Sequence, residues 1–263
     1  PYAAAVRASK VTRELIRSVD PHVVVADILT VAAALAAELE ERPWATLVPH
    51  VMPMSAPGFP VYALGAVAPR TGLGERLWRL ARPLPMKGER QGRLELNGAR
   101  ERVGLAPLPH LHGGISRELA LVATFPQLEY PRPAVEPWMR VTGPLLWEQP
   151  FGDVEPPPGS APLVLLAPST SQDPEHRLLR AALAGLADAP VRVLATTNRR
   201  TPAGALRIPG NARVVDWVSY ARTMPRCRAV VCHAGHGTIA RALACGVPVV
   251  ACPHAGDQAE NAA

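Results

Sequence analysis

The sequence predicts an α/β protein built from two parallel-sheet domains, and three features of the chain carry that prediction. Apolar runs of strand length, such as 23–26 and 163–167, alternate with longer stretches of helical periodicity. These runs are apolar throughout, which indicates strands buried on both faces, as in parallel sheets covered by helices. A proline-rich segment, 148–162, is the predicted linker between an N-terminal domain at 1–147 and a C-terminal domain at 163–263.

The N-terminal domain opens with a predicted helix at 3–19, which Pro21 ends. The further predicted elements are a strand at 23–26, a helix at 29–41, and strands at 45–48 and 119–125. Between 50 and 115 prolines recur, so only one helix, at 74–80, is predicted there.

The C-terminal domain opens with a predicted strand at 163–167 and a helix at 174–186, for which Asp173 is a suitable N-terminal cap. Ser169 and Thr170 lie between them, at the carboxyl end of the strand. Hydroxyl groups in that position suit a phosphate site, although a hydroxyl-rich turn without a ligand explains them equally well.

The most informative stretch is 228–258, which has the pattern of a strand, a glycine loop, a helix and a second strand. The predicted elements are a strand at 229–232, a helix at 239–245 capped by Thr238, and a strand at 247–252. Gly235 and Gly237 have no side chain to keep an anion from the loop amides and the helix N-terminus. A glycine turn in an ordinary βαβ unit is the alternative. His233 and the pair 257–258, at two strand ends, favour a ligand site.

Three spaced motifs resemble the donor signature of family 1 glycosyltransferases: His233-Ala-Gly-His-Gly-Thr238, Gly246-Val-Pro248, and Pro253-His-Ala-Gly-Asp-Gln258 with Asn261-Ala262. That family includes UDP- and TDP-sugar transferases, among them bacterial enzymes that glycosylate antibiotics and macrolides. The resemblance implies a GT-B type fold, with two Rossmann-like domains facing a cleft. It also implies that both domains are incomplete here, lacking the first strands at one end and the closing helices at the other. A catalytic base histidine is then expected in the missing N-terminal part.

The resemblance also implies roles for residues of the C-terminal domain. Trp217 matches the aromatic that stacks on the nucleobase and Val218 the backbone that reads its edge, with a core tryptophan as the alternative. Arg241 stands where many relatives carry a glutamate that binds the ribose, and Tyr220 where many carry glutamine. The implied donor-binding residues are Ser169, Thr170, Trp217, Val218, His233, Gly235, His236, Gly237, Thr238, Asp257 and Gln258.

The function that the resemblance implies is inverting, metal-independent transfer of a sugar from a UDP- or TDP-sugar to a hydroxyl of a small apolar or aromatic acceptor, such as a natural-product aglycone. No cofactor is expected beyond the nucleotide diphosphate-sugar, which is a co-substrate. The acceptor-binding residues are unassigned, and a homodimer is left open. The alternatives are a nucleotide-sugar epimerase and a non-catalytic nucleotide-sugar binding partner.

Composition and charge narrow the other classes of partner. The net charge is +6, but the basic residues are scattered arginines without an aromatic-studded basic run, so no nucleic acid is expected. No apolar run of about 18 residues is present, so no stable membrane insertion is expected, and without a signal peptide the predicted location is cytoplasmic. The four cysteines, Cys227, Cys232, Cys245 and Cys252, lack a Cys-x-x-Cys pair and are interpreted as small buried hydrophobes rather than as metal ligands.

Overall fold

The computed structural model describes residues 2–54, 56–110, 114–130, 136–170 and 172–263. The chain forms two compact units. The first comprises Pro1–Val61 and Ala68–Leu145, and the second comprises Tyr62–Val67 and Leu146–Ala263.

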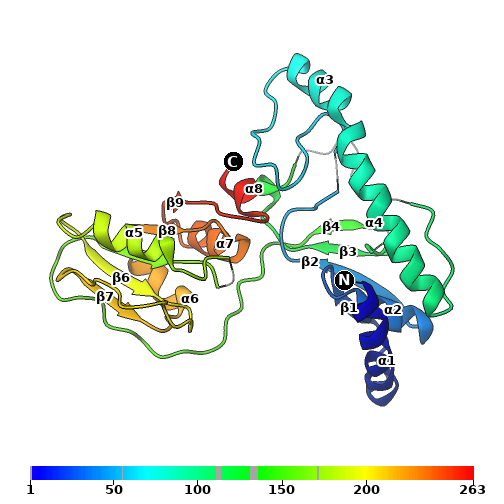
Figure 1. Cartoon of the computed structure of the whole chain (residues 1–263), viewed down its shortest axis with the longest axis horizontal. Coiled ribbons are helices and arrows are strands. Elements are labelled where there is room, and N and C mark those ends of the chain that lie inside the picture. Colours follow the sequence, from blue (N-terminus) through cyan, green and yellow to red (C-terminus); the bar gives the residue numbers. More distant parts are fainter. Residues whose placement is uncertain (1, 55, 111–113, 131–135, 171) are drawn as a thin grey trace. The chain divides into compact units, whose positions relative to one another are not determined.

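The first unit is built on a four-stranded sheet in which every strand pair is parallel (Figure 1). The strands follow one another in the order β1 (Val24–Asp27), β2 (Trp44–Val48), β3 (Ala120–Val122) and β4 (Met139–Val141). The helix α1 (Tyr2–Val19) packs on α2 (Val31–Leu39), which in turn packs on β1. Parallel pairing with helical cover is the predicted fold class, and it is confirmed for this unit.

Alanine explains how α2 packs so closely on the sheet. Five of its nine residues are buried, and four of those five are alanine. The helix begins two residues later than predicted because the Asp27 carboxylate accepts the backbone N–H of Leu29 at 2.8 Å, which holds a turn at the strand end. A cluster formed by Val48, Met52, Ile115, Ala120, Val122, Trp138 and Met139 makes a second part of the core.

The prediction of little regular structure between 50 and 115 was wrong for its second half. The helix predicted at 74–80 is confirmed as α3 (Gly72–Ala81), but the 20-residue α4 (Pro83–Arg102) was not predicted. Proline is compatible with the first turn of a helix, where its missing N–H group costs no hydrogen bond, so Pro83 begins α4 rather than interrupting it. The Thr71 side chain caps α3 by accepting the backbone N–H of Gly74.

The second unit is built on a five-stranded parallel sheet whose strand order reverses direction near its middle. The order across the sheet is β7 (Ala212–Val215), β6 (Arg192–Thr196), β5 (Leu163–Ala167), β8 (Ala229–Cys232) and β9 (Val249–Ala251). The chain therefore moves outward from β5 in one direction and then resumes on its other side with β8. Such a reversal is the place where ligands bind in open α/β sheets, outside the carboxyl ends of the strands.

The described part of the second unit also contains the α-helices α5 (Arg177–Gly185), α6 (Tyr220–Thr223), α7 (His236–Ala244) and α8 (Gln258–Ala262). Leu179 and Leu183 of α5 lie in one cluster with Val164, Leu166 and Val193 of the sheet. All five side chains are buried, so the sheet and α5 share a continuous apolar core.

The starts of two helices differ from their predicted positions. α5 begins at Arg177 rather than at 174, because the Asp173 carboxylate accepts the N–H groups of Arg177 and Leu178 from outside the helix. α7 begins at His236 rather than at 239, with Gly235 as its cap, so the predicted cap Thr238 lies inside the helix.

A buried ion pair in the first unit yields a stability test. The Arg100 guanidinium, only 5% exposed, forms two bonds of 2.7–2.8 Å with Glu38. Replacing Glu38 by Ala leaves that charge buried without its partner, and we expect a loss of about 2–3 kcal/mol in the free energy of unfolding. The matched control is Glu75→Ala, which breaks the exposed Arg79–Glu75 pair and should cost less than about 0.5 kcal/mol. Urea unfolding checks both, and equal effects would contradict the role given to burial.

Candidate functional site

The pairing of β5 with β8 brings two loops together at the carboxyl edge of the second sheet. Ala167, at the end of β5, is in register with Cys232, at the end of β8. Ser169 therefore lies next to His233, and the backbone N–H of Ser169 donates to Nδ1 of His233 at 2.8 Å. The sequence predicted both residues as donor-binding, and the structure brings them into direct contact.

The loop from β8 to α7 is tightly held at its base and open at its tip. Ala234, fully buried, adopts a left-handed backbone with φ of 63°, and its carbonyl accepts Nδ2 of Asn261 at 3.0 Å. At the tip, a Cβ atom added to Gly235 or Gly237 would meet no atom within 4 Å. Because the first N–H groups of a helix have no acceptor inside the helix, the start of α7 offers donors to an anion at this open place.

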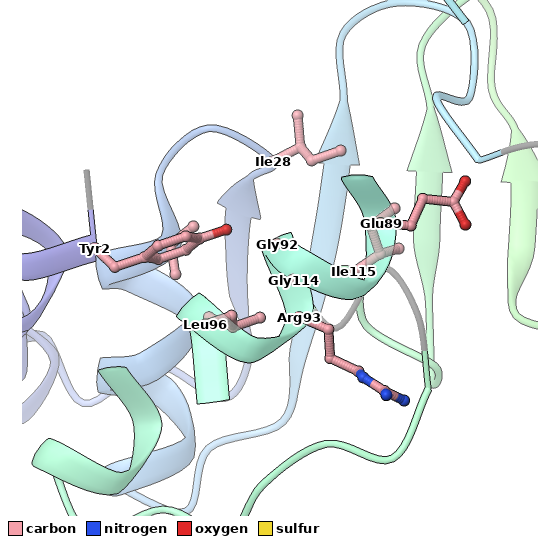
Figure 2. A pocket seen from close by; sticks show the side chains of 9 residues that line it. Tyr2, Ile28, Glu89, Gly92, Arg93, Leu96, Gly114 and Ile115 are labelled. Carbon is pink, nitrogen blue, oxygen red and sulfur yellow. The ribbon is translucent and has the colours of Figure 1, made fainter. Parts of the chain in front are cut away.

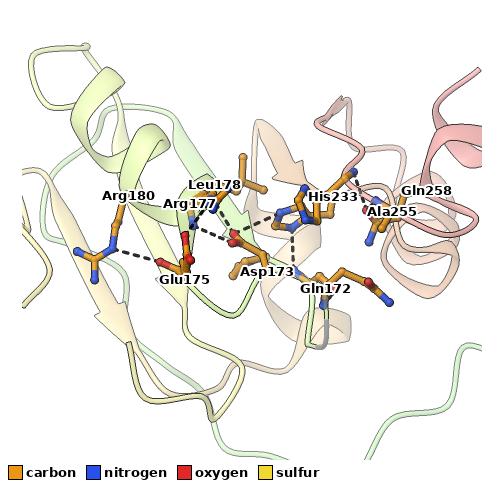
Figure 3. A network of polar contacts seen from close by, with 12 residues as sticks. Gln172, Asp173, Glu175, Arg177, Leu178, Arg180, His233, Ala255 and Gln258 are labelled. Carbon is orange, nitrogen blue, oxygen red and sulfur yellow. Dashed lines mark hydrogen bonds and ion pairs between the residues drawn. The ribbon is translucent and has the colours of Figure 1, made fainter. Parts of the chain in front are cut away.

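His233 is buried, and its two ring nitrogens are engaged on the protein side of the loop. Its Nδ1 accepts the Ser169 N–H, and its Nε2 lies 3.4 Å from Oδ2 of Asp173 (Figure 3). Burial lowers the pKa of the imidazole below its ordinary value, although the Asp173 carboxylate opposes the shift; His254 adds to the lowering. The ring is therefore neutral and links the β8–α7 loop to the β5–α5 loop.

The Asp173 side chain, which contacts this ring, is 3% exposed. Burial by itself raises the pKa of the carboxyl, but hydrogen bonds from the backbone N–H groups of Arg177 and Leu178, at 2.9 and 3.0 Å, outweigh it. The pKa of Asp173 consequently lies below its ordinary value, and the carboxylate stays ionised. The sequence predicted Asp173 only as a helix cap, and nothing in the pattern indicated its contact with His233.

Asp257 and Gln258, at the start of α8, follow the neighbouring strand β9. The Gln258 side chain is buried, and its Oε1 accepts the backbone N–H groups of His254 and Ala255 at 2.8 and 3.0 Å (Figure 3). Asp257 is partly exposed, and its Oδ2 accepts Nδ2 of Asn261 at 3.0 Å. Asn261 thus joins α8 to the β8–α7 loop, a role that the motif did not reveal.

The predicted nucleobase side lies at the carboxyl end of β7. Val218 is buried, whereas Trp217 is partly exposed, with the Arg199 guanidinium 4.8 Å from its ring centroid. The Tyr220 ring lies parallel to Trp217 at 6.4 Å, and its hydroxyl donates to Oδ1 of Asn198. Burial raises the pKa of the Tyr220 phenol, so this ring is a neutral side chain of the packed edge.

Glu148 is a polar residue of this region that sequence reasoning missed. Its Oε1 accepts the Ser219 hydroxyl and the backbone N–H of Ala221, and its Oε2 lies 4.0 Å from Nη2 of Arg241. It was assigned to the linker at 148–162, and no local motif signals that a linker residue folds back onto the segment after Trp217.

The remaining predicted donor residues occupy the same two loops. Thr170 is exposed, and its carbonyl accepts Nη1 of Arg200 at 3.1 Å. His236 is buried with its Nδ1 3.3 Å from Oδ1 of Asn261, and the N–H of Thr238 donates to the Gly235 carbonyl in the first turn of α7.

Within residues 2–54, 56–110, 114–130, 136–170 and 172–263, no three His, Cys, Asp or Glu side chains form a group able to hold a metal ion. Over the same ranges, no helix combines the length and apolarity needed to cross a bilayer. The four cysteines are free thiols, and burial raises the pKa of Cys227 to about 11.

The first unit contains a separate pocket of about 190 Å³ (Figure 2). It lies among α1, α2 and α4, with Gly114 and Ile115 also lining it. Apolar side chains, including Tyr2, Ile28 and Leu96, make most of its wall, and Arg93 and Glu89 supply charge. The sequence assigned no residue to acceptor binding, and this partly open pocket lies in a unit for which no site residue was predicted.

The fold is similar to those of solved glycosyltransferases. The kitacinnamycin glycotransferase superposes with a TM-score of 0.66 at 23% identity, covering 98% of this chain and 64% of that one. The glycosyltransferase VinC, solved in complex with DTDP, superposes with a TM-score of 0.59 at 20% identity, covering 96% of this chain and 61% of that one. At these identities the likeness concerns the fold, which is therefore of the GT-B glycosyltransferase class, as predicted.

Sequence comparison places the chain more narrowly. Residues 180–263 match the family described as "Erythromycin biosynthesis protein CIII-like, C-terminal domain". The 4'-demethylrebeccamycin synthase of Lentzea aerocolonigenes is 32% identical over 176 residues, which are 62% of this chain and 40% of that protein. A PGL/p-HBAD biosynthesis rhamnosyltransferase of Mycobacterium bovis (strain BCG / Pasteur 1173P2) is 34% identical over 184 residues, 66% of this chain and 38% of that protein.

The family match thus covers residues 180–263 of a chain whose fold is of the GT-B class. The matched part of the chain spans about 40% of the length of these two curated relatives.

The buried neutral state of His233 predicts how stability depends on pH. Because the folded pKa lies below the ordinary value of about 6.5, the unfolded chain binds a proton first as the pH falls. The contribution of His233 is therefore complete above about pH 6.5 and is lost as the pH decreases below it. Asp173, with a pKa also lowered, adds the same trend only below about pH 4.

Urea unfolding between pH 8 and 5 should show a steeper loss of stability for the wild type than for His233→Gln. His22→Gln, at an exposed site, should keep the wild-type slope, and identical slopes in all three would contradict the assignment.

Proposed function

We propose that the whole protein is an inverting, metal-independent glycosyltransferase that moves a sugar from a UDP- or TDP-sugar to a hydroxyl of a small apolar or aromatic acceptor. The observation that carries this proposal is the open tip of the β8–α7 loop, at the reversal of strand order in the second sheet. The relatives support the class of reaction, since one is named a TDP-daunosamine transferase (44% identity over 69 residues) and a solved neighbour was captured with DTDP.

In this proposal the diphosphate binds at the start of α7. The nine-residue helix directs its partial positive charge at the loop, and Gly235 and Gly237 leave room for phosphate oxygens against the backbone. The same donors stabilise the negative charge that grows on the leaving nucleotide as the sugar departs, which is electrostatic catalysis of the oxyanion-hole kind. On this basis the reaction proceeds without a bound metal.

His233 receives a narrower role than the sequence suggested. Contact between its ring and a phosphate would require one of its two bonds, to the Ser169 N–H or to Asp173, to open. We therefore assign the first contacts with the diphosphate to the amides of Gly235, His236 and Gly237, because the Thr238 N–H already donates to the Gly235 carbonyl. His233 then supports the loop that presents these amides.

The base and the sugar bind on either side of the diphosphate in this proposal. Trp217 stacks on the nucleobase where Arg199 now lies over its ring, and backbone at Val218 meets the edge of the base. Asp257 is the stronger candidate for the sugar hydroxyls, because it is partly exposed whereas the buried Gln258 holds its own loop through Oε1. A hydroxyl of the acceptor attacks the anomeric carbon and loses its proton to a general base, while the nucleoside diphosphate leaves.

The glycine loop gives the direct test. Gly235→Ala and Gly237→Ala add a Cβ where no protein atom lies within 4 Å, so both variants should fold normally. The same methyl group would occupy the space of the diphosphate, so calorimetric affinity for UDP or TDP should fall by about tenfold or more, equivalent to about 1.4 kcal/mol.

The control is Gly185→Ala, in the last turn of α5, where an added Cβ is equally free of contacts and the loop is untouched. It should bind the nucleotide as the wild type does. Wild-type affinity in both loop variants would remove the phosphate site from the start of α7.

A further inference from the structure

The contact between Asp173 and His233 is more specific than a salt bridge in a protein interior. The two side chains are 3% and 5% exposed, and each has its remaining polar atoms occupied by backbone N–H groups. The carboxylate holds the start of α5, and the imidazole receives the N–H of Ser169. A closed chain of hydrogen bonds thus joins the β5–α5 loop to the β8–α7 loop (Figure 3).

These hydrogen bonds determine which ring nitrogen of His233 carries the proton. A backbone N–H can only donate, so Nδ1, which receives the Ser169 N–H at 2.8 Å, must be the unprotonated nitrogen. The proton of the neutral ring is then on Nε2, which points at the Asp173 carboxylate, an obligatory acceptor. Either the other tautomer or the imidazolium ion would set an N–H of the ring against the N–H of Ser169.

The charge of Asp173 is also compatible with a neighbouring anion site. Its two oxygens accept from Arg177, Leu178 and His233, so its negative charge is offset by the start of α5 and by the ring. His176 and His254 are the other titratable side chains that act on this pair. The carboxylate is buried, and each of its oxygens accepts at least one hydrogen bond.

We propose that Asp173 is a positioning residue of the donor site, which holds His233 as the Nε2–H tautomer and thereby clamps the β8–α7 loop onto the β5–α5 loop. With Asn261 bonded to the Ala234 carbonyl from the other side, the clamp keeps the open amides of α7 in place for a diphosphate. This inference rests on the proposed function for its ligand, whereas the state of the ring is a property of the chain without ligand.

The experiment compares two replacements of Asp173 with one control. Asp173→Ser leaves one shorter oxygen near the start of α5 and no acceptor for His233, and Asp173→Asn keeps one oxygen for the N–H groups of α5 while offering an N–H to Nε2. Glu175→Gln removes a carboxylate from the same turn, 62% exposed and paired with Arg177, without touching the ring. The readouts are ¹⁵N NMR of the imidazole in the ligand-free 263-residue chain and calorimetric binding of UDP and TDP.

The expected ¹⁵N spectrum of the wild type and of Glu175→Gln shows His233 with its proton on Nε2. Asp173→Ser should lower the share of the Nε2–H tautomer, because only the Ser169 N–H then favours it, and Asp173→Asn should move the proton to Nδ1 and break the bond with Ser169. Nucleotide affinity should fall about tenfold in both Asp173 variants, because the loop amides are then less well positioned, and remain unchanged in Glu175→Gln.

Two outcomes would overturn the proposal. One is an unchanged Nε2–H signal in both Asp173 variants, which would reduce Asp173 to a helix cap. The other is a changed tautomer with wild-type nucleotide affinity, which would separate the ring from the donor site. If the folded wild type bound neither UDP nor TDP, the proposed function would fail, while the NMR comparison would still decide how Asp173 acts on His233.

Discussion

The parallel pairing of β5 with β8 is the interaction on which the candidate site depends. These strands are far apart in sequence, and their pairing places the reversal of strand order between two loops of different chemistry. One loop brings Ser169 and Asp173, and the other brings His233 and the two open glycines. Because all strands of the sheet are parallel, the loops after β7 and β9 emerge at the same edge, so Trp217 and Asp257 share it.

Much of this arrangement could be predicted because it follows from local patterns. Apolar runs of four or five residues indicated the strands β1, β2, β5 and β8, and parallel order then required their carboxyl ends to meet. The prediction failed for residues 83–102 because proline was interpreted as a helix breaker, although Pro83 stands in the first turn of α4. Side-chain partners far apart in sequence, such as Asp173 with His233 or Asn261 with Ala234, leave no local pattern, so the sequence could not reveal them.

The β8–α7 loop is held in place at Ala234 and is open at its two glycines. Ala234 adopts a left-handed backbone that costs a residue with a side chain about 1 kcal/mol, and the Asn261 bond and complete burial stabilise it there. Two residues further on, the glycines meet no neighbouring atom. A preorganised anion site requires this combination, because donors that are already in place need no reorganisation when charge develops near them.

Arg241 differs from the motif of the family that the sequence resembles. Many members of that family carry a glutamate at this position, so the arginine by itself suggests a reversal of charge. The structure places the Glu148 carboxylate 4.0 Å from Arg241, with side chains 25% and 14% exposed, so the local charge is close to balanced. Because Glu148 also accepts hydrogen bonds from Ser219 and Ala221, it ties the segment after Trp217 to the chain that enters this unit. An arginine at position 241 is thus compatible with the proposed donor site, since Glu148, from another segment, places a carboxylate beside it.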